Sequence, residues 1–326
     1  MGHVCAWLLG RNLMKHAFGN IKGSYAILSY DDYIVFSGPE LLIFKRDGNF
    51  IAACRDLGYV RKCIRVSANT ILVDYSSKNF YSLISLIDGS EVWRITQPKL
   101  DYTCSRFAIS SDKRYVYDRF DLRGKHYYVR IDLATKELLK YQIQHQMRCV
   151  SDMVCIQTGH PVFLESHYEE NENISTEGIS INGVICHSEK EWNQLFRWQF
   201  IYPQIARFFI RDADTILTQD LCIYKPSNGE MYSLIEDNES WGNPGNSPPD
   251  YYLHDEQYLV LIYDTVNVIV DLIKRKMCAR YVADHRIGSI VGNEYWVCTD
   301  EGIVKKPFPA IENIPIKKYN FWSPWN

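Results

Sequence analysis

The sequence has no long hydrophobic run and no excess of basic charge. No stretch approaches the roughly 18 apolar residues that a membrane-spanning helix needs, so we expect no membrane segment. The chain has 36 Lys and Arg residues against 39 Asp and Glu residues, which gives a formal net charge of −3. Nucleic-acid-binding domains usually carry a basic excess instead. These two absences argue against a membrane protein and against nucleic acid as a partner.

The cysteines include no C-x-x-C pair, although the sequence has 10 of them. Most lie in predicted strands, where Cys behaves as a small buried hydrophobic residue, and their scatter is typical of a reducing compartment. The first residues, MGHVCAWLLGRNLMKH, lack the basic start and long apolar run of a signal peptide. We therefore expect a cytoplasmic protein.

Motifs for catalysis and cofactor binding are also missing. The sequence has no Walker A motif, no G-x-G-x-x-G, no G-x-S-x-G and no H-E-x-x-H. Ser110 and Lys113 form an S-x-x-K match, but they fall in a predicted hairpin turn. Potential metal ligands gather at Cys155, His160, Glu165, His167, Cys186 and His187, with a spacing that matches no standard zinc pattern. We predict no catalytic residue, no metal and no cofactor.

A recurring hairpin organises what is present. In LLIFKRDGNFIAACR (41–55), Asp47-Gly48 separates two apolar runs, and Asp-Gly in that position is a strong hairpin signal because Gly adopts φ > 0. The same pattern recurs every 41 to 47 residues, centred on Asp88-Gly89, Thr135, Asn182-Gly183, Asn228-Gly229 and Lys274. Each repeat contains four short predicted strands, and a period of roughly 40–50 residues is the size of one propeller blade.

The repeats predict an all-β fold, a seven-bladed β-propeller of four-stranded antiparallel blades. We expect one domain, with the blades at 23–308 and only three strands in the seventh. Because propellers avoid exposed edges by closing the ring, a terminal strand should complete that blade. The N-terminal segment 1–22 is the expected closing strand, and the aromatic C-terminal tail 309–326 is the alternative.

Two stretches carry a family resemblance. SRFAISSDKRYVYDRF (105–120), a strand, an S-x-D turn and a second strand, resembles the first hairpin of a WD-repeat or quinoprotein-like propeller blade. DGSEVW, from Asp88 to Trp93, is similar to the end of the quinoprotein tryptophan motif. No repeat has the Trp-Asp or Gly-His pairs of true WD repeats, so the resemblance is to the architecture. It implies the usual role of cytoplasmic propellers, a protein-binding subunit of a complex.

Three long segments, 167–178, 188–204 and 236–250, are predicted to lie on the same face of the propeller. Long loops in compact domains are often functional, so we place the binding surface there. Segment 188–204 has a capping-box spacing and apolar residues at helical intervals, which predicts a short amphipathic helix. The candidate interface residues in these segments and the C-terminal tail are Glu169, Glu170, Glu172, Trp192, Phe196, Trp241, Trp322 and Trp325.

We predict a non-catalytic scaffold propeller with a protein partner, and two other hypotheses stay open. The first is a propeller that processes a small ligand or glycan with carboxylates at the channel mouth, for which the candidates are Asp74, Asp118, Asp220, Asp264 and Asp300. Basic and imidazole groups on that face form a possible anion site at Arg119, Arg123, Lys125, His126, His145 and Arg148. The second is a stoichiometric inhibitor or immunity-type protein.

Overall fold

The structure is a computed structural model. It describes residues 21–23, 25–55, 58–75, 79–96, 102–103, 107–110, 112–123, 125–142, 150–155, 161–169, 178–186, 192–200, 208–212, 215–218, 222–225, 228, 230–233, 250–254, 257–262, 266–282 and 288–308. Between residues 150 and 218 it describes the backbone alone.

In the described residues the chain forms β-strands and no helix, and the strands make seven antiparallel sheets that follow one another along the sequence. Sheet 1 contains β1 (Ala26–Ser29), β2 (Tyr33–Ser37), β3 (Leu41–Lys45) and β4 (Phe50–Cys54). Sheet 2 contains β5 (Val60–Ser67), β6 (Thr70–Tyr75), β7 (Phe80–Ser85) and β8 (Glu91–Thr96). Sheet 3 contains β9 (Tyr102–Thr103), β10 (Ala108–Ile109), β11 (Tyr115–Leu122), β12 (Lys125–Asp132) and β13 (Glu137–Gln142).

The second half of the chain continues the pattern. Sheet 4 contains β14 (Val150–Cys155), β15 (Pro161–Glu169), β16 (Gly178–Cys186) and β17 (Trp192–Phe200). Sheet 5 contains β18 (Phe208–Asp212), β19 (Thr215–Thr218), β20 (Cys222–Lys225) and β21 (Glu230–Ser233). Sheet 6 contains β22 (Asp250–His254), β23 (Tyr258–Ile262), β24 (Val266–Asp271) and β25 (Lys276–Val282). Sheet 7 contains β26 (Gly288–Val291), β27 (Glu294–Cys298) and β28 (Ile303–Pro307).

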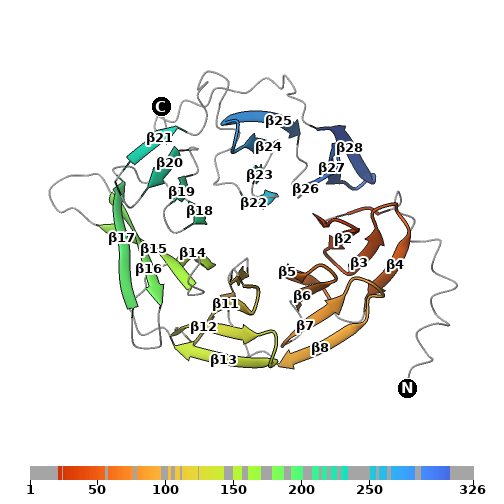
Figure 1. The fold of residues 1–326 in the computed structure, drawn as a ribbon, viewed down its shortest axis with the longest axis horizontal. Coiled ribbons are helices and arrows are strands. Elements are labelled where there is room, and N and C mark those ends of the chain that lie inside the picture. The colour runs from red at the N-terminus through yellow and green to blue at the C-terminus, as the bar shows by residue number, and fades with distance from the viewer. Residues whose placement is uncertain are drawn as a thin grey trace.

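The sheets stand around a ring. Figure 1 shows β14, β18, β22 and β26 nearest the centre and β8, β13, β17, β21, β25 and β28 at the rim. The first and last sheets meet, because β1 lies beside β26 and β27, and the Gly23 N–H donates a 3.0 Å hydrogen bond to the Thr299 carbonyl. This arrangement confirms the predicted all-β propeller class. Of the two proposed closing segments, residues 1–20 of segment 1–22 and the whole of segment 309–326 lie outside the described residues.

Residues of the second strands are buried on both sides because each sheet has a neighbour on either face. In β2, Ile34, Val35 and Phe36 are all 0% exposed. Ile34 and Phe36 pack with Trp296 of sheet 7, while Val35 packs with Ile71 of sheet 2. Successive side chains of the strand point to opposite faces and therefore enter two different inter-sheet cores. Because both faces are buried, the sequence of the strand is an unbroken apolar run.

The same backbone hydrogen bond joins the turns of five sheets. In each, the residue after the third strand donates to the carbonyl of the residue before the second strand, at 2.8–2.9 Å. The pairs, donor first, are Arg46 and Asp32, Leu86 and Asn69, Leu133 and Arg114, Leu272 and Gln257, and Phe308 and Asn293. The repeat seen in the sequence is therefore also a repeat of local geometry.

The Asp-Gly turns have the predicted conformation. Gly48 has φ 92° and Gly89 has φ 72°, the left-handed region that glycine enters without steric cost. The equivalent positions in sheets 3 and 6 are Lys136 and Arg275, with φ of 61° and 53°. A residue with a side chain enters this region only at a steric cost in free energy. The strand pairing of sheets 3 and 6 must therefore offset that cost at these two turns.

One predicted hairpin is wrong. Asn182-Gly183 is not a turn: both residues lie within β16, which pairs with β15 on one side and β17 on the other. The register of β16 against β17 shifts between Gly183 and Val184. Glycine within a strand often marks such a bulge. The continuous pairing on both sides accommodates the Asn-Gly pair without reversing the chain.

Candidate functional site

The two ends of the sheets differ in their connections. At one end, which we call the hairpin-turn end, first strands join second strands and third strands join fourth strands; no connection is longer than residues 86–90 between β7 and β8. At the other end, the loop-bearing end, residues 170–177 join β15 to β16 and residues 234–249 join β21 to β22. The long connections therefore leave the same end, as predicted for two of the three segments.

The third segment is wrongly predicted. Trp192 and Phe196 lie in β17, the fourth strand of sheet 4, and not in a helix. Aromatic residues occupy every second position through much of WNQLFRWQF, at Trp192, Phe196, Trp198 and Phe200, and aromatics favour strands. This period-two pattern and the pairing with β16 outweigh the capping-box spacing. Segment 188–204 is thus mostly strand, with residues 201–207 as the connection to sheet 5.

The other predicted interface residues have limited structural description. Glu169 is the last residue of β15, at the loop-bearing end. The remaining candidates lie outside the described residues: Glu170, Glu172, Trp241, Trp322 and Trp325.

Two of the predicted channel-mouth carboxylates come together around one lysine. Asp74 on β6 and Asp118 on β11 are both 0% exposed, and Lys62 on β5 is 6% exposed. The Lys62 ammonium donates a hydrogen bond to Oδ1 of Asp118 and lies 3.8 Å from Oδ2 of Asp74. The lysine therefore joins sheet 2 to sheet 3 and balances two buried carboxylates.

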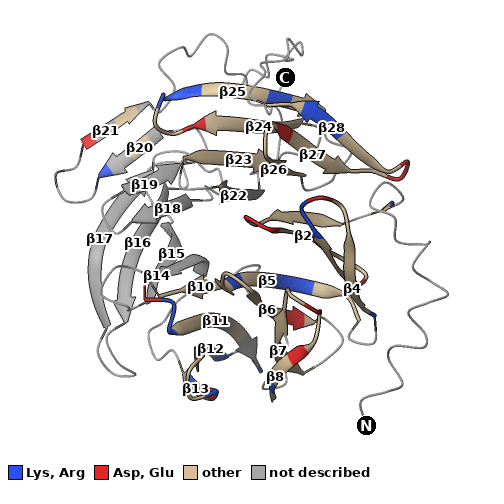
Figure 2. Cartoon of the chain, turned by 45° about the vertical axis from the view of Figure 1, so that its right-hand side comes forward, with Lys and Arg blue, Asp and Glu red and all other residues tan. Residues whose placement is uncertain are grey.

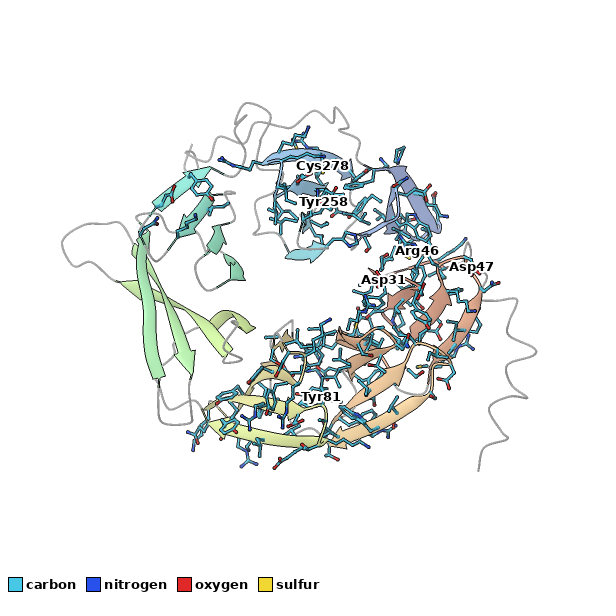
Figure 3. All side chains as sticks on the ribbon, in the orientation of Figure 1. Asp31, Arg46, Asp47, Tyr81, Tyr258 and Cys278 are labelled. Carbon is cyan, nitrogen blue, oxygen red and sulfur yellow. The ribbon has the colours of Figure 1, made fainter. Side chains whose placement is uncertain are left out.

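Neighbouring groups complete this charge cluster. The Tyr81 hydroxyl donates a 2.7 Å hydrogen bond to Oδ2 of Asp118, and Figure 3 shows Tyr81 between sheets 2 and 3. The Lys62 ammonium lies 4.8 Å from the centre of the Phe107 ring. Arg61, the most exposed member, places Nε 3.5 Å from Oδ2 of Asp74. With two cations and two carboxylates the cluster is balanced, which suits burial better than an unpaired charge would.

This arrangement gives Asp74 and Asp118 a packing role. A carboxylate acting on a substrate must be within hydrogen-bond reach of it, whereas Asp74 and Asp118 are enclosed between two sheets. Of the other predicted carboxylates, Asp300 is exposed in the turn after β27, and Asp220 and Asp264 lie outside the described residues. Lys62 was missed at the sequence level, because a Lys in a strand usually indicates an exposed position.

The predicted anion-binding group is only partly described. Arg123 and Lys125 flank the turn between β11 and β12 at the loop-bearing end, and both are exposed. Arg119 and His126 lie on β11 and β12, and only their backbone is described. His145 and Arg148 lie outside the described residues.

An exposed tyrosine stands at the loop-bearing end, between sheets 1 and 2. Tyr59 precedes β5 and is 48% exposed, while the adjacent Val60 is 3% exposed and packs in the core. Arg55 holds the Glu40 carboxylate through Nε at 2.7 Å, and the Val60 N–H donates to the Gly38 carbonyl at 2.8 Å. The segment that presents Tyr59 is therefore anchored at both of its ends.

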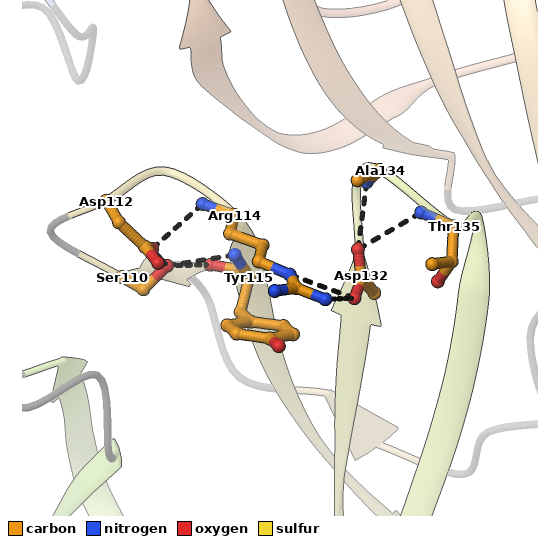
Figure 4. A network of polar contacts seen from close by, with 7 residues as sticks. All are labelled: Ser110, Asp112, Arg114, Tyr115, Asp132, Ala134 and Thr135. Carbon is orange, nitrogen blue, oxygen red and sulfur yellow. Dashed lines mark hydrogen bonds and ion pairs between the residues drawn. The ribbon is translucent and has the colours of Figure 1, made fainter.

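The S-x-x-K match belongs to a structural network at the hairpin-turn end (Figure 4). The Ser110 hydroxyl donates to Oδ1 of Asp112 at 2.6 Å and accepts from the Tyr115 N–H at 2.8 Å. The Arg114 guanidinium donates through Nε and Nη2 to Oδ2 of Asp132, at 3.2 and 3.0 Å. The Ser110 hydroxyl therefore fixes a turn.

Burial favours the neutral thiol at three cysteines of the described residues. Burial raises the pKa of Cys54 and of Cys278 to about 12 and that of Cys63 to about 11. In the part of the chain that the structure describes, no three His, Cys, Asp or Glu side chains are placed to hold a metal ion. The same residues contain no helix with the length and apolar character to cross a membrane.

No protein-family model and no curated protein matches this sequence. Solved structures do match its fold. The chain is similar to the β-propeller domain of Cps50 (Swd1) from Myceliophteria thermophila, with 10% identity over 88% of this chain and 97% of that one and a TM-score of 0.56. It is also similar to dihydro-heme d1 dehydrogenase NirN in complex with DHE, with 14% identity over 89% of this chain and 67% of that one and a TM-score of 0.51. At these identities the likeness establishes the β-propeller fold alone.

Proposed function

We propose that this protein is a non-catalytic scaffold propeller, a cytoplasmic subunit of a protein complex that binds its partner through the loop-bearing end. The observation that carries the proposal is the difference between the two ends of the sheets. Connections at the hairpin-turn end are uniformly short, while the long connections 170–177 and 234–249 both join strands at the other end. Loops of this length on a rigid scaffold are disproportionately used for binding.

Two features of the described residues support this proposal. Tyr59, 48% exposed, lies at the loop-bearing end on an anchored segment, and tyrosine is among the residues enriched in interface hot spots. Asp74 and Asp118, the carboxylates that favoured the alternative of a propeller enzyme, are enclosed by Lys62 and Tyr81.

The test is capture of a partner by tagged full-length protein from the native host, with mass spectrometry of the bound material. The intact chain is compared with a variant that lacks residues 238–249 and with Tyr59→Ala. We expect a stoichiometric partner that is lost from the deletion variant and reduced with Tyr59→Ala, while both variants keep the thermal unfolding midpoint of the intact chain.

The matched control is Ile87→Ala. Ile87 is 61% exposed and lies at the hairpin-turn end, so its truncation removes a similar exposed apolar group from the opposite end. The proposal would be contradicted if Ile87→Ala lost the partner while Tyr59→Ala and the deletion variant kept it. The interface would then lie at the hairpin-turn end. Absence of a partner with the intact chain would remove the scaffold proposal.

A further inference from the structure

We propose that the outer edge of β28 is a strand-binding site, and that residues 3–10 of this chain bind there as the fourth strand of sheet 7. We call the site the β28 edge and define it by the backbone of Ile303, Lys305 and Pro307. The geometry of this edge favours the N-terminal segment over the C-terminal tail. The site does not depend on what the loop-bearing end binds, so the two can be tested separately.

Sheet 7 has three strands in the described residues, whereas sheets 1, 2 and 6 each have four. Figures 1 and 2 show β28 as its outermost strand. On its inner side β28 pairs with β27, with Ile303 opposite Cys298 and Lys306 opposite Tyr295. The position that β4, β8 and β25 occupy in their own sheets therefore lies beside the outer edge of β28.

The backbone groups of alternate residues point to that outer edge. The Phe308 N–H donates to the Asn293 carbonyl at 2.8 Å, and before β28 the Gly302 N–H donates to the Thr299 carbonyl at 3.2 Å. In an antiparallel pair, residues that bond the neighbouring strand alternate with residues whose N–H and C=O groups point to the other side. The residues of β28 with outward backbone groups are therefore Ile303, Lys305 and Pro307.

Pro307 is incompatible with the hairpin that leads from the third strand to the fourth in other sheets. Lys45, the last residue of β3, donates its N–H to the Asn49 carbonyl at 2.8 Å and accepts the Gly48 N–H at 2.9 Å. The last residue of β7 makes the same two bonds, both at 2.9 Å. Pro307, the last residue of β28, has no N–H to donate, and its carbonyl already accepts the Tyr281 hydroxyl at 2.7 Å.

The residues that follow β28 are also unsuited to that turn. In sheets 2, 3 and 6 the fourth residue after the third strand has positive φ, at Gly89, Lys136 and Arg275. The fourth residue after Pro307 is Ile311. A β-branched residue with positive φ is a genuine outlier. A hairpin from β28 into the C-terminal tail would thus lose a hydrogen bond and strain the backbone, so the fourth strand must come from elsewhere.

The N-terminal segment meets sheet 7 at the end where a fourth strand would finish. Ile21 is 4% exposed and packs with Trp296 and Cys298 of β27. The Gly23 N–H donates to the Thr299 carbonyl at 3.0 Å, at the loop-bearing end. Because β28 begins at this end, a strand antiparallel to it runs toward this end and can continue to residue 21.

The length and composition of the segment also fit the β28 edge. The fourth strand would lie about 10 Å from β27, two strand spacings away, and the ten residues 11–20 span about 33–36 Å when extended. Residues 4–9, VCAWLL, are consecutive apolar residues. Val304 of β28 is 40% exposed, and a strand beside it would remove apolar surface of both from water.

Hydrogen exchange of single amides, measured by NMR on the full-length protein, tests the pairing. The Ile303 and Lys305 amides should exchange slowly because the fourth strand bonds them. The variant Ala6→Pro/Trp7→Pro removes two consecutive donors, one of which faces β28 in either register. It should speed exchange of the Ile303 and Lys305 amides at least about tenfold.

Two controls accompany this measurement. The Val304 and Lys306 amides bond β27 and should stay slow in every protein. The matched variant Lys317→Pro/Lys318→Pro removes two consecutive donors from the C-terminal tail and should leave the β28 edge slow. Fast exchange at the edge in the intact chain would show that no strand binds there and would overturn the proposal. Faster exchange with the tail variant alone would assign the edge to the tail.

Photo-cross-linking of the intact chain does not depend on how the proline variants fold. The probe p-benzoylphenylalanine replaces Leu8 in one protein and Tyr319 in another, and the cross-linked peptides are identified by mass spectrometry. We expect cross-links from position 8 to residues 303–307 and none from position 319 to those residues. Cross-links to β28 from position 319 alone would contradict binding of the N-terminal segment, and cross-links from position 8 only to a second molecule would show strand exchange between chains instead.

Discussion

Lys62 and Asp118 lie on different sheets and share a buried hydrogen bond, from the Lys62 ammonium to Oδ1 of Asp118. The side chain of Lys62 is 3% exposed and that of Asp118 is 0% exposed. Because Lys62 also lies 3.8 Å from Asp74, one ammonium balances two carboxylates across the seam. The seam between sheets 2 and 3 is therefore partly electrostatic, while that between sheets 1 and 7 is packed with apolar side chains.

Lys62→Met should destabilise the protein by about 3–5 kcal/mol, because it leaves Asp118 as a buried charge without its cation. The double variant Lys62→Met/Asp118→Asn removes both charges and keeps an acceptor for Tyr81, so it should recover most of the loss. Urea unfolding monitored by tryptophan fluorescence measures both. Additive effects of the two substitutions would contradict a direct coupling between them.

Two buried tyrosines of sheet 2 should respond differently to loss of the hydroxyl. Tyr81 donates to Asp118, so Tyr81→Phe should cost about 1.5–3 kcal/mol, the range for a hydrogen bond to a charged group. Tyr75 is 0% exposed, and its hydroxyl has no hydrogen-bond partner among the described residues. Burial raises its pKa. Tyr75→Phe should therefore be neutral or stabilising. A larger loss of stability with Tyr75→Phe than with Tyr81→Phe would contradict this reading of sheet 2.

Alanine substitutions at two glycines with positive φ should distinguish the cost of backbone strain from the cost of a steric contact. At Gly89, with φ +72°, an added Cβ would lie 2.1 Å from the Cβ of Ala52, whereas at Gly23, with φ +102°, it would meet nothing within 4 Å. Gly23→Ala should cost about 1–2 kcal/mol from the backbone alone, and Gly89→Ala should cost more because sheets 1 and 2 must also move apart. Equal shifts of the thermal unfolding midpoint would show that the contact with Ala52 relaxes without cost.

The parts of the fold that local sequence determines were the predictable ones. Asp47-Gly48 and Asp88-Gly89 form the predicted hairpins because turn chemistry and flanking apolar runs agree. At Asn182-Gly183 the same signal failed, since β15 and β17 pair along the whole of β16. At Trp192 the capping-box pattern competed with an alternating aromatic pattern, and pairing with β16 decided for the strand.

The charge cluster was only half predictable, for a different reason. The sequence pointed to Asp74 and Asp118 as carboxylates of the channel mouth, whereas the structure places them together between sheets 2 and 3, with Asp118 in the middle of β11. Nothing local to either residue indicates that Lys62 enters between them, because that contact joins residues of different sheets. Distant pairing is set by the packing of whole sheets, which a single sequence does not display.

Asp132 and Asp271 should make the stability of the protein fall in acid. Burial alone would raise the pKa of Asp132, but hydrogen bonds from the Thr135 and Ala134 N–H groups and the Arg114 guanidinium outweigh it, and the net effect lowers that pKa. The pKa of Asp271 is likewise lowered, against burial, by the Lys274 and Ile273 N–H groups and the Gln257 amide. In both turns the ionised carboxylate is the form that the folded chain stabilises.

The sign of the effect follows from linkage. When the pKa in the folded state is below the value of about 3.9 in the unfolded state, the unfolded state binds more protons between the two values. The stabilising contribution is then complete above about pH 4 and is lost as the pH falls through the lower, folded-state pKa. Asp132→Asn/Asp271→Asn should therefore lower the thermal unfolding midpoint at pH 7 and flatten its decrease below pH 4.

The control for this pH dependence is Asp300→Asn/Glu301→Gln, which removes the same charge from an exposed turn of sheet 7. It should keep the midpoint at pH 7 and the steep decrease in acid, because both side chains are exposed. Differential scanning fluorimetry from pH 7 to pH 2.5 compares the three proteins. If the control variant flattened the curve as much as the Asp132/Asp271 variant, acid sensitivity would come from total charge and not from the two turns.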